Sequence, residues 1–140
     1  MPTMPYSHFQ GQCAEALAFY GTVFGGTNLQ TLRYADAPEA PPAWQGSTRI
    51  MHGQITIYDG TLMASDYPPG VTGDGQKGFS VMQTAPDVPA AKAIFEQLAD
   101  GGQIIDAFKP TFLSPEFGMV CDKFGTHWII STLPTEGAQS

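Results

Sequence analysis

The sequence predicts an α+β fold of two βαβββ modules that form a curved sheet around a cleft. Two observations carry this prediction. The stretch AEALAFYGTVFGG (14–26) is echoed by AAKAIFEQLADGG (90–102), with the same length and the same terminal glycine pair. The hairpin stretches DGTLMAS (59–65) and FGTHWIIS (124–131) both place Gly-Thr before a return strand. Because the two echoes occur in the same order, we interpret them as an internal duplication.

The composition fits one compact domain of short elements. The chain has 140 residues, of which 42% are hydrophobic and 14% charged, with 16 glycines and 12 prolines. Such a composition favours short strands and frequent turns over long helices. We expect a single domain over 1–140, with a first module over 1–66 and a second over 78–134.

The first module is expected to begin with a short strand in MPYSHF (4–9). A helix from about Gln12 follows, with three apolar residues at helical spacing, Leu17, Tyr20 and Phe24. The glycine pair at 25–26 supplies the backbone freedom that a helix C-terminus needs. NLQTLRYA is extended, and RIMHGQITIYDGTLMAS (49–65) is a hairpin.

The second module repeats this order. FSVMQT (79–84) is strand-like, and a helix follows with Asp87 as N-cap and Pro89 in its first turn. Its expected buried stripe is Ala91, Ile94, Phe95 and Leu98. QIIDAF, FGMVCD and HWIISTL complete three strands, with Asp122 capping a turn and Trp128 in the core.

Charge and patterning exclude several classes of partner. The formal net charge is −7, and the six Lys and Arg residues are scattered, which argues against nucleic acid and against an anionic membrane. The N-terminus has neither the basic start nor the apolar run of a signal peptide, and no stretch is long enough for a membrane span. Cys13 and Cys121 are isolated, which fits reduced thiols in a cytoplasmic protein.

Three stretches resemble the vicinal oxygen chelate superfamily, which includes glyoxalase I, bleomycin-resistance proteins and extradiol dioxygenases. They are FQGQCAEALAFYGTVFGG (9–26), IMHGQITIYDGTLMASD (50–66) and PTFLSPEFGMVCDKFGTHWII (110–130), and they resemble its PhnB-like branch in particular. One departure is that Leu113 follows Phe112, where the branch commonly has Trp. The resemblance implies paired βαβββ modules around a ligand cleft and, commonly, a homodimer.

Members of this branch often carry a 3-demethylubiquinone methyltransferase-like label. An S-adenosylmethionine site normally has a glycine-rich turn that leads from a strand into a helix. Neither FGG (24–26) nor DGG (100–102) fits, because each follows a helix. We therefore do not infer a methyl transfer from the label, and we expect no cofactor.

For metal-dependent members, the resemblance implies His, Glu or Gln ligands on the first and last strand of each module. Counting from the glycines and helices gives the corresponding positions as Pro5 or Ser7, Ala64, Phe79 or Val81, and Ile129. None of these is a carboxylate or an imidazole, and His8 would point away from the cleft if Ser7 faces it. We expect no metal site and no specific stabilisation by Zn²⁺, Ni²⁺, Mn²⁺ or Fe²⁺.

His52 has two interpretations that the sequence leaves open. It is either a histidine hydrogen-bonded within the sheet or a cleft residue that serves as a donor or general base. A three-residue loop, Tyr58-Asp59-Gly60, would set His52, Ala64 and Asp66 on one face, whereas a two-residue Asp59-Gly60 loop would separate them. Asp66 itself is expected to be a turn cap or a solvated carboxylate.

These observations predict a small-molecule binding protein without the metal site of the superfamily. The expected ligand contacts are Trp44, His52, Phe79, Phe112, Phe117 and Ile129. The Pro-rich loops at 36–46 and 66–77 are long enough to act as lids, and Trp44 is expected at the cleft mouth or a dimer interface, unless it only anchors its loop. The alternatives are a metal-dependent lyase, isomerase or dioxygenase of the glyoxalase type with a displaced site, and a purely structural or partner-binding domain.

Overall fold

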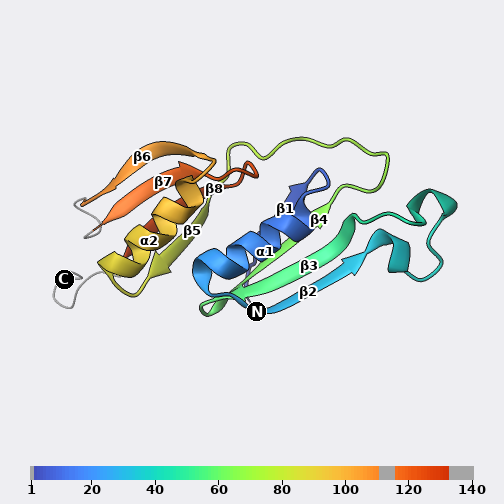
Figure 1. Cartoon of the computed structure of the whole chain (residues 1–140), viewed down its shortest axis with the longest axis horizontal. Coiled ribbons are helices and arrows are strands. Elements are labelled where there is room, and N and C mark those ends of the chain that lie inside the picture. Colours follow the sequence, from blue (N-terminus) through green and yellow to red (C-terminus); the bar gives the residue numbers. More distant parts are fainter. Residues whose placement is uncertain (1, 111–115, 133–140) are drawn as a thin grey trace. The chain divides into compact units, whose positions relative to one another are not determined.

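The computed structural model describes residues 2–110 and 116–132, which form two four-stranded sheets, each with one long helix (Figure 1). The chain divides into two compact units, Met1–Gln76 and Lys77–Ser140, and each unit is described by itself. The division falls within the expected connector at 66–77. The predicted α+β class with two repeated modules is confirmed.

The two units share one topology. The first contains β1 (Tyr6–Phe9), α1 (Cys13–Phe24), β2 (Thr27–Arg33), the short 3-10 turns η1 (Tyr34–Asp36) and η2 (Pro42–Trp44), β3 (Ile50–Ile57) and β4 (Gly60–Asp66). The second contains β5 (Val81–Ala85), α2 (Val88–Ala99), β6 (Gln103–Lys109), β7 (Phe117–Cys121) and β8 (His127–Thr132). Their strand orders are β1-β4-β3-β2 and β5-β8-β7-β6, with the first pair of each sheet parallel and the other pairs antiparallel.

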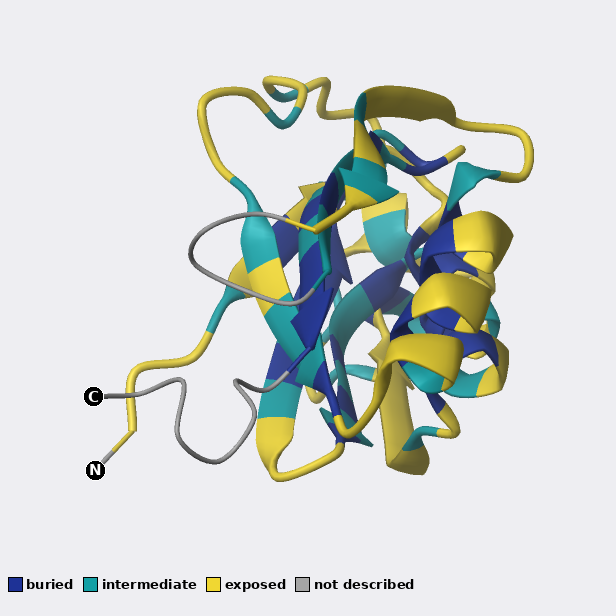
Figure 2. Ribbon diagram, turned by 90° about the vertical axis from the view of Figure 1, so that its left-hand side faces the viewer, coloured by how far each residue is buried: buried dark blue, intermediate teal, exposed yellow. Residues whose placement is uncertain are grey.

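Each helix packs on its sheet at a glycine of the third strand. A Cβ atom on Gly53 of β3 would lie 2.5 Å from Leu17 Cδ1 of α1, and one on Gly118 of β7 would lie 2.7 Å from Phe95 Cε2 of α2. Only a residue without a side chain allows this approach. The buried residues therefore gather between each helix and its sheet, while the outer helix sides are exposed (Figure 2). The buried stripe expected on the second helix is confirmed.

The two helices begin with different caps. The Asp87 carboxylate accepts a hydrogen bond from Ala90 N at 2.8 Å, which confirms the predicted N-cap. In α1 the capping carboxylate comes from β4, because Asp66 Oδ1 accepts from Gly11 N at 2.8 Å and from Cys13 N at 2.9 Å. A negative charge at a helix N-terminus also stabilises the helix dipole. Asp66 is 1% exposed, so the solvated alternative is wrong, and its carboxylate caps α1 instead of a turn of the connector.

The two hairpins differ in loop length. In the first, Ile57 pairs with Gly60, so the loop is Tyr58-Asp59, and Tyr58 adopts the left-handed region with φ 52°. The observed Tyr58-Asp59 loop differs from both predicted loops. Like the predicted two-residue loop, it places His52 and Ala64 on opposite faces of the sheet. In the second, Cys121 pairs with His127, which leaves a longer loop. The Gly-Thr pairs are therefore not equivalent, and the counted match of Ala64 with Ile129 is wrong: Ala64 faces α1, whereas Ile129 faces away from α2.

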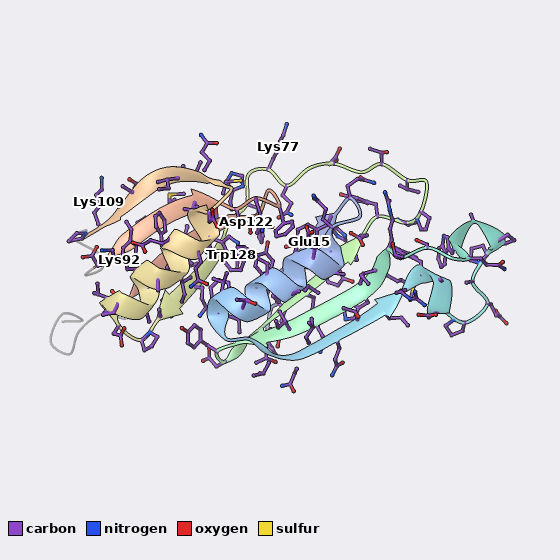
Figure 3. All side chains as sticks on the ribbon, viewed as in Figure 1. Glu15, Lys77, Lys92, Lys109, Asp122 and Trp128 are labelled. Carbon is purple, nitrogen blue, oxygen red and sulfur yellow. The ribbon has the colours of Figure 1, made fainter. Side chains whose placement is uncertain are left out.

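Asp122 holds the longer loop. Its Oδ1 accepts from Phe124 N at 2.9 Å and Thr126 N at 3.1 Å, and its Oδ2 accepts from Trp128 Nε1 at 2.9 Å. The two side chains are labelled in Figure 3. The predicted turn cap at Asp122 and the core position of Trp128, which is 1% exposed, are both confirmed.

Candidate functional site

The face of the first sheet opposite α1 carries a cluster of polar and aromatic side chains. We name it the polar-aromatic face and define it by six residues: Tyr6, His8, His52, Gln54, Ser65 and Tyr67. Ser7 pairs with Ala64, and Ala64 pairs with Gly53, so these three residues lie on the α1 side of the sheet. Their neighbours along β1, β3 and β4 point to the opposite side. Ser7 was counted as a possible first-strand metal position, but Ser7 and Phe9 are both buried on the α1 side, whereas His8 lies on the polar-aromatic face.

Hydrogen bonds connect this face across three strands. Tyr6 OH lies 2.9 Å from His52 Nδ1, and His52 Nε2 lies 3.1 Å from Gln54 Oε1. Ser65 Oγ lies 3.0 Å from His8 Nδ1. In the strand order β1-β4-β3, the Tyr6 side chain crosses β4 to reach His52. The interpretation of His52 as a histidine hydrogen-bonded within the sheet is confirmed, and its role as a cleft donor or general base stays a prediction.

Aromatic rings form a row along the edge of the same face. The Tyr6 ring lies 5.3 Å from the His8 ring and 5.7 Å from the His52 ring, measured between centroids. Tyr67, just after β4, stacks on His8 at 5.5 Å with an interplanar angle of 26°. Such a row offers flat contacts to another planar ring.

The connector after β4 is fastened to the first unit. The Arg49 guanidinium donates from Nη1 to Tyr67 O at 3.0 Å and to Pro68 O at 3.2 Å. The Gln10 side chain donates to Val71 O at 2.7 Å and accepts from Gly73 N at 3.0 Å. These bonds hold Tyr67 in place beside His8. This part of the expected lid is thus tied down by side chains of the first unit.

Trp44 packs within its own unit. Its half-buried ring lies edge-on to Tyr34 at 4.8 Å and 69°. Tyr34 OH donates to Asp66 O at 2.7 Å, and burial, with the Asp66 charge second, raises the pKa of Tyr34. This contact with Tyr34 agrees with the alternative that Trp44 only anchors its loop. A contact between Trp44 and a ligand stays a prediction.

The other predicted contacts belong to the second unit. Phe117 and Ile129 lie on the face opposite α2, where Ile129 pairs with Met119 and Met82. Phe79 precedes β5 and is 51% exposed. Phe112 lies outside the described residues. This face carries mainly apolar side chains around Met82, Met119 and Ile129, with Thr84 and Ser131 beside them.

A pocket of about 330 Å³ lies between α2 and β6 on the helix side of the second sheet. Its lining consists of Lys92, Phe95, Glu96, Ala99, Ile104 and Phe108. The rings of Phe95 and Phe108 stack at 5.4 Å and form its apolar wall. The pocket offers apolar contact, but its side chains make no hydrogen-bonded arrangement like that of the polar-aromatic face.

The donors do not fit a metal held by the first and last strands. At the positions opposite the helices these strands carry Tyr6, His8, Met63, Ser65, Met82, Thr84, Ile129 and Ser131. Within residues 2–110 and 116–132, no three His, Cys, Asp or Glu side chains gather where they could hold a metal ion. In the same part of the chain, no helix is long and apolar enough to cross a membrane.

Sequence reasoning missed most of the polar-aromatic face. Tyr6, His8, Gln54, Ser65 and Tyr67 were not among the predicted contacts. The signal was present in the first strand, where apolar Phe9 alternates with Tyr6 and His8. A buried Phe on a strand indicates the core side, so the alternate residues must point away from it.

Comparisons with known proteins show one family model and several similar proteins. A family model described as 3-demethylubiquinone-9 3-methyltransferase matches residues 2–131. Protein YjdN of Escherichia coli (strain K12) is 30% identical over 148 residues, covering 99% of this chain and 100% of that protein. The crystal structure of protein PA1353 from Pseudomonas aeruginosa is 35% identical, with a TM-score of 0.86 over 96% of this chain and 98% of that one.

The fold extends to more distant proteins. A glyoxalase/bleomycin resistance protein from Albidiferax ferrireducens T118 is 12% identical, with a TM-score of 0.63 over 95% of this chain and 99% of that one. At this identity the likeness concerns the fold alone.

Proposed function

The chain belongs to the 3-demethylubiquinone-9 3-methyltransferase family, and we propose that it binds a small molecule on the polar-aromatic face. The observation that carries the proposal is the hydrogen-bonded set of partly exposed side chains on that face. Polar groups placed among aromatic rings are typical of small-molecule sites.

A methyl transfer has no support from the chain's own residues. Both glycine pairs follow the helices, since Gly25 is the left-handed C-cap of α1 and Gly101 follows α2 with φ 75°. Neither pair forms the turn from a strand into a helix that an S-adenosylmethionine site normally uses. A metal-dependent lyase or dioxygenase is likewise not proposed, because the donor set described above does not fit the metal.

The proposal is tested by a thermal-shift screen of small aromatic compounds and of divalent ions. We expect stabilisation of the wild type by some compounds and no specific stabilisation by Zn²⁺, Ni²⁺, Mn²⁺ or Fe²⁺. A Tyr6→Phe, His8→Ala double variant should lose the compound effect. Tyr58→Phe is the matched control, because Tyr58 is 44% exposed and Tyr6 42%, but Tyr58 lies in the hairpin loop. Equal stabilisation of all three proteins would contradict the proposal.

The remaining contacts and properties are proposed on weaker support. His52 and Trp44 stay candidate contacts in the first unit, and Phe79, Phe117 and Ile129 in the second. The outer strand β6 exposes Ile104 at 52% and Ile105 at 49%, which supports a homodimer. Cys13 and Cys121 are free thiols, which supports a reducing, cytoplasmic location. Sedimentation showing a monomer at micromolar concentration would contradict the dimer.

A further inference from the structure

The hydrogen bonds of His52 have one consistent direction. We assign the hydrogen to His52 Nε2, because the Gln54 oxygen that lies 3.1 Å from it can only accept. In a neutral imidazole the other nitrogen then accepts. The Tyr6 hydroxyl, 2.9 Å from His52 Nδ1, must therefore donate. The direction runs from Tyr6 to His52 and on to Gln54.

This direction decides what Tyr6 offers to a ligand. A phenol has one hydrogen, and Tyr6 directs it inward to His52. The Tyr6 oxygen then presents only lone pairs outward. Tyr6 is 42% exposed, whereas His52 is half-buried and both of its nitrogens have partners. A ligand that meets this group must itself donate a hydrogen bond to Tyr6.

The hydrogen-bond partners of His52 are the neutral side chains of Tyr6 on β1 and Gln54 on its own strand. Leu32 is its register partner on β2, and Met63 of β4 pairs with both Tyr6 and Gln54. The next titratable group is His8, which contacts the Tyr6 ring and has Ser65 as its partner. Tyr67 then contacts His8.

We infer that Tyr6, His52 and Gln54 form a proton relay that selects planar ligands with an acidic hydroxyl, such as a phenol or an enol. The inference rests on the proposed function, since it needs a ligand on the polar-aromatic face. The ligand O–H passes its proton to Tyr6 Oη while the proton of Tyr6 passes to His52 Nδ1. The products are a ligand oxyanion and a His52 imidazolium, whose Nε2–H stays donated to Gln54. The ligand ring packs beside Tyr6, His8 and Tyr67.

The probe for this relay is 4-nitrophenol, whose anion absorbs visible light, with 4-nitroanisole as the control that lacks the hydrogen. We expect the wild type to bind 4-nitrophenol about tenfold more tightly than 4-nitroanisole and to increase the fraction of anion at fixed pH. One hydrogen bond to a charged partner accounts for such a factor. Tyr6→Phe should abolish both differences, and Tyr58→Phe should leave them unchanged.

Nitrogen NMR of the His52 ring gives a second readout that needs no ligand. We expect hydrogen on Nε2 in the free protein, with the signal assigned by its loss in His52→Gln. Hydrogen on Nδ1 would overturn the relay, because Tyr6 would then accept. The relay would also be overturned, with the proposed function intact, if 4-nitroanisole bound as tightly as 4-nitrophenol and Tyr6→Phe weakened both. If neither probe shifted any resonance of β1, β3 or β4, both proposals would be wrong.

Discussion

The faces of the two sheets opposite their helices differ far more than the rest of the two units. In the first unit, Tyr6, His52 and Gln54 are hydrogen-bonded to one another. In the second, the equivalent side of the sheet presents Met82, Met119 and Ile129. Strand order, helix placement and the glycine under each helix are the same. The repeated backbone therefore fixes the helix side, and we propose that the functional residues lie on the other side, where the helix imposes no packing requirement.

The two units also differ in the role of their buried aspartates, Asp66 and Asp122. Asp66 joins separate elements, because it accepts from residues before and within α1 and, at 2.8 Å, from Ile50 N of β3. Asp122 acts within one hairpin loop and on Trp128 of the strand that follows. One carboxylate holds a unit together, whereas the other shapes a turn.

The largest effect is expected from Asp66→Ala. It leaves the buried N–H groups of Cys13 and Ile50 and the part-buried N–H group of Gly11 without their acceptor, which costs about 3 to 5 kcal/mol of unfolding free energy. Asp122→Ala should cost nearly as much, about 3 kcal/mol, because the N–H groups of Phe124 and Thr126 and the Trp128 Nε1 group are buried as well. Urea unfolding measures both. Asp59→Ala, in the exposed hairpin loop, is the control, and equal losses for Asp66→Ala and Asp59→Ala would break the contrast.

Alanine substitutions in the two glycine pairs that follow the helices should differ in the stability they lose, as measured by urea unfolding. A Cβ on Gly102 would lie 2.3 Å from Cys121 O, a backbone atom that cannot give way. A Cβ on Gly26 would lie 2.6 Å from Ile55 Cδ1, the end of a side chain. We expect Gly102→Ala to lose about 3 kcal/mol and Gly26→Ala about 1 to 2 kcal/mol. Gly75→Ala, with nothing within 4 Å, is the control. A larger loss at Gly26 would contradict this account.

A smaller effect is expected from the thiols at high pH. Burial, with the Asp66 charge second, raises the pKa of Cys13 from 9.0 to about 12, and burial also raises the pKa of Cys121. Since the folded state disfavours the Cys13 thiolate, its contribution to stability is complete below pH 9 and is lost as the pH rises toward 12. Cys13→Ala should lack this dependence. In the folded protein a thiol reagent should label Cys121 before Cys13, and the reverse order would contradict the burial argument.

Periodicity was enough to predict the helices, the strands and the buried stripe of α2, because apolar spacing reports directly on the core. The face of the sheet toward which each side chain of the first strand points was not predicted. It was set by counting from the helix, and a loop of unknown length makes that count uncertain by one residue, which reverses every side chain. The same uncertainty produced the wrong match of Ala64 with Ile129. His52 was found because an imidazole in a strand is conspicuous, whereas its partners Tyr6 and Gln54 become visible only when the strand order β1-β4-β3-β2 is known.

The central claim is that the ligand surface lies on the polar-aromatic face of the first unit. Backbone amide NMR with a stabilising aromatic compound tests it most directly, because each shifted resonance reports a position in the sheet. We predict the largest shifts at Tyr6, His8, His52 and Gln54, with saturation at one compound per chain. Shifts confined to the apolar face of the second unit, around Met82 and Ile129, would contradict the claim.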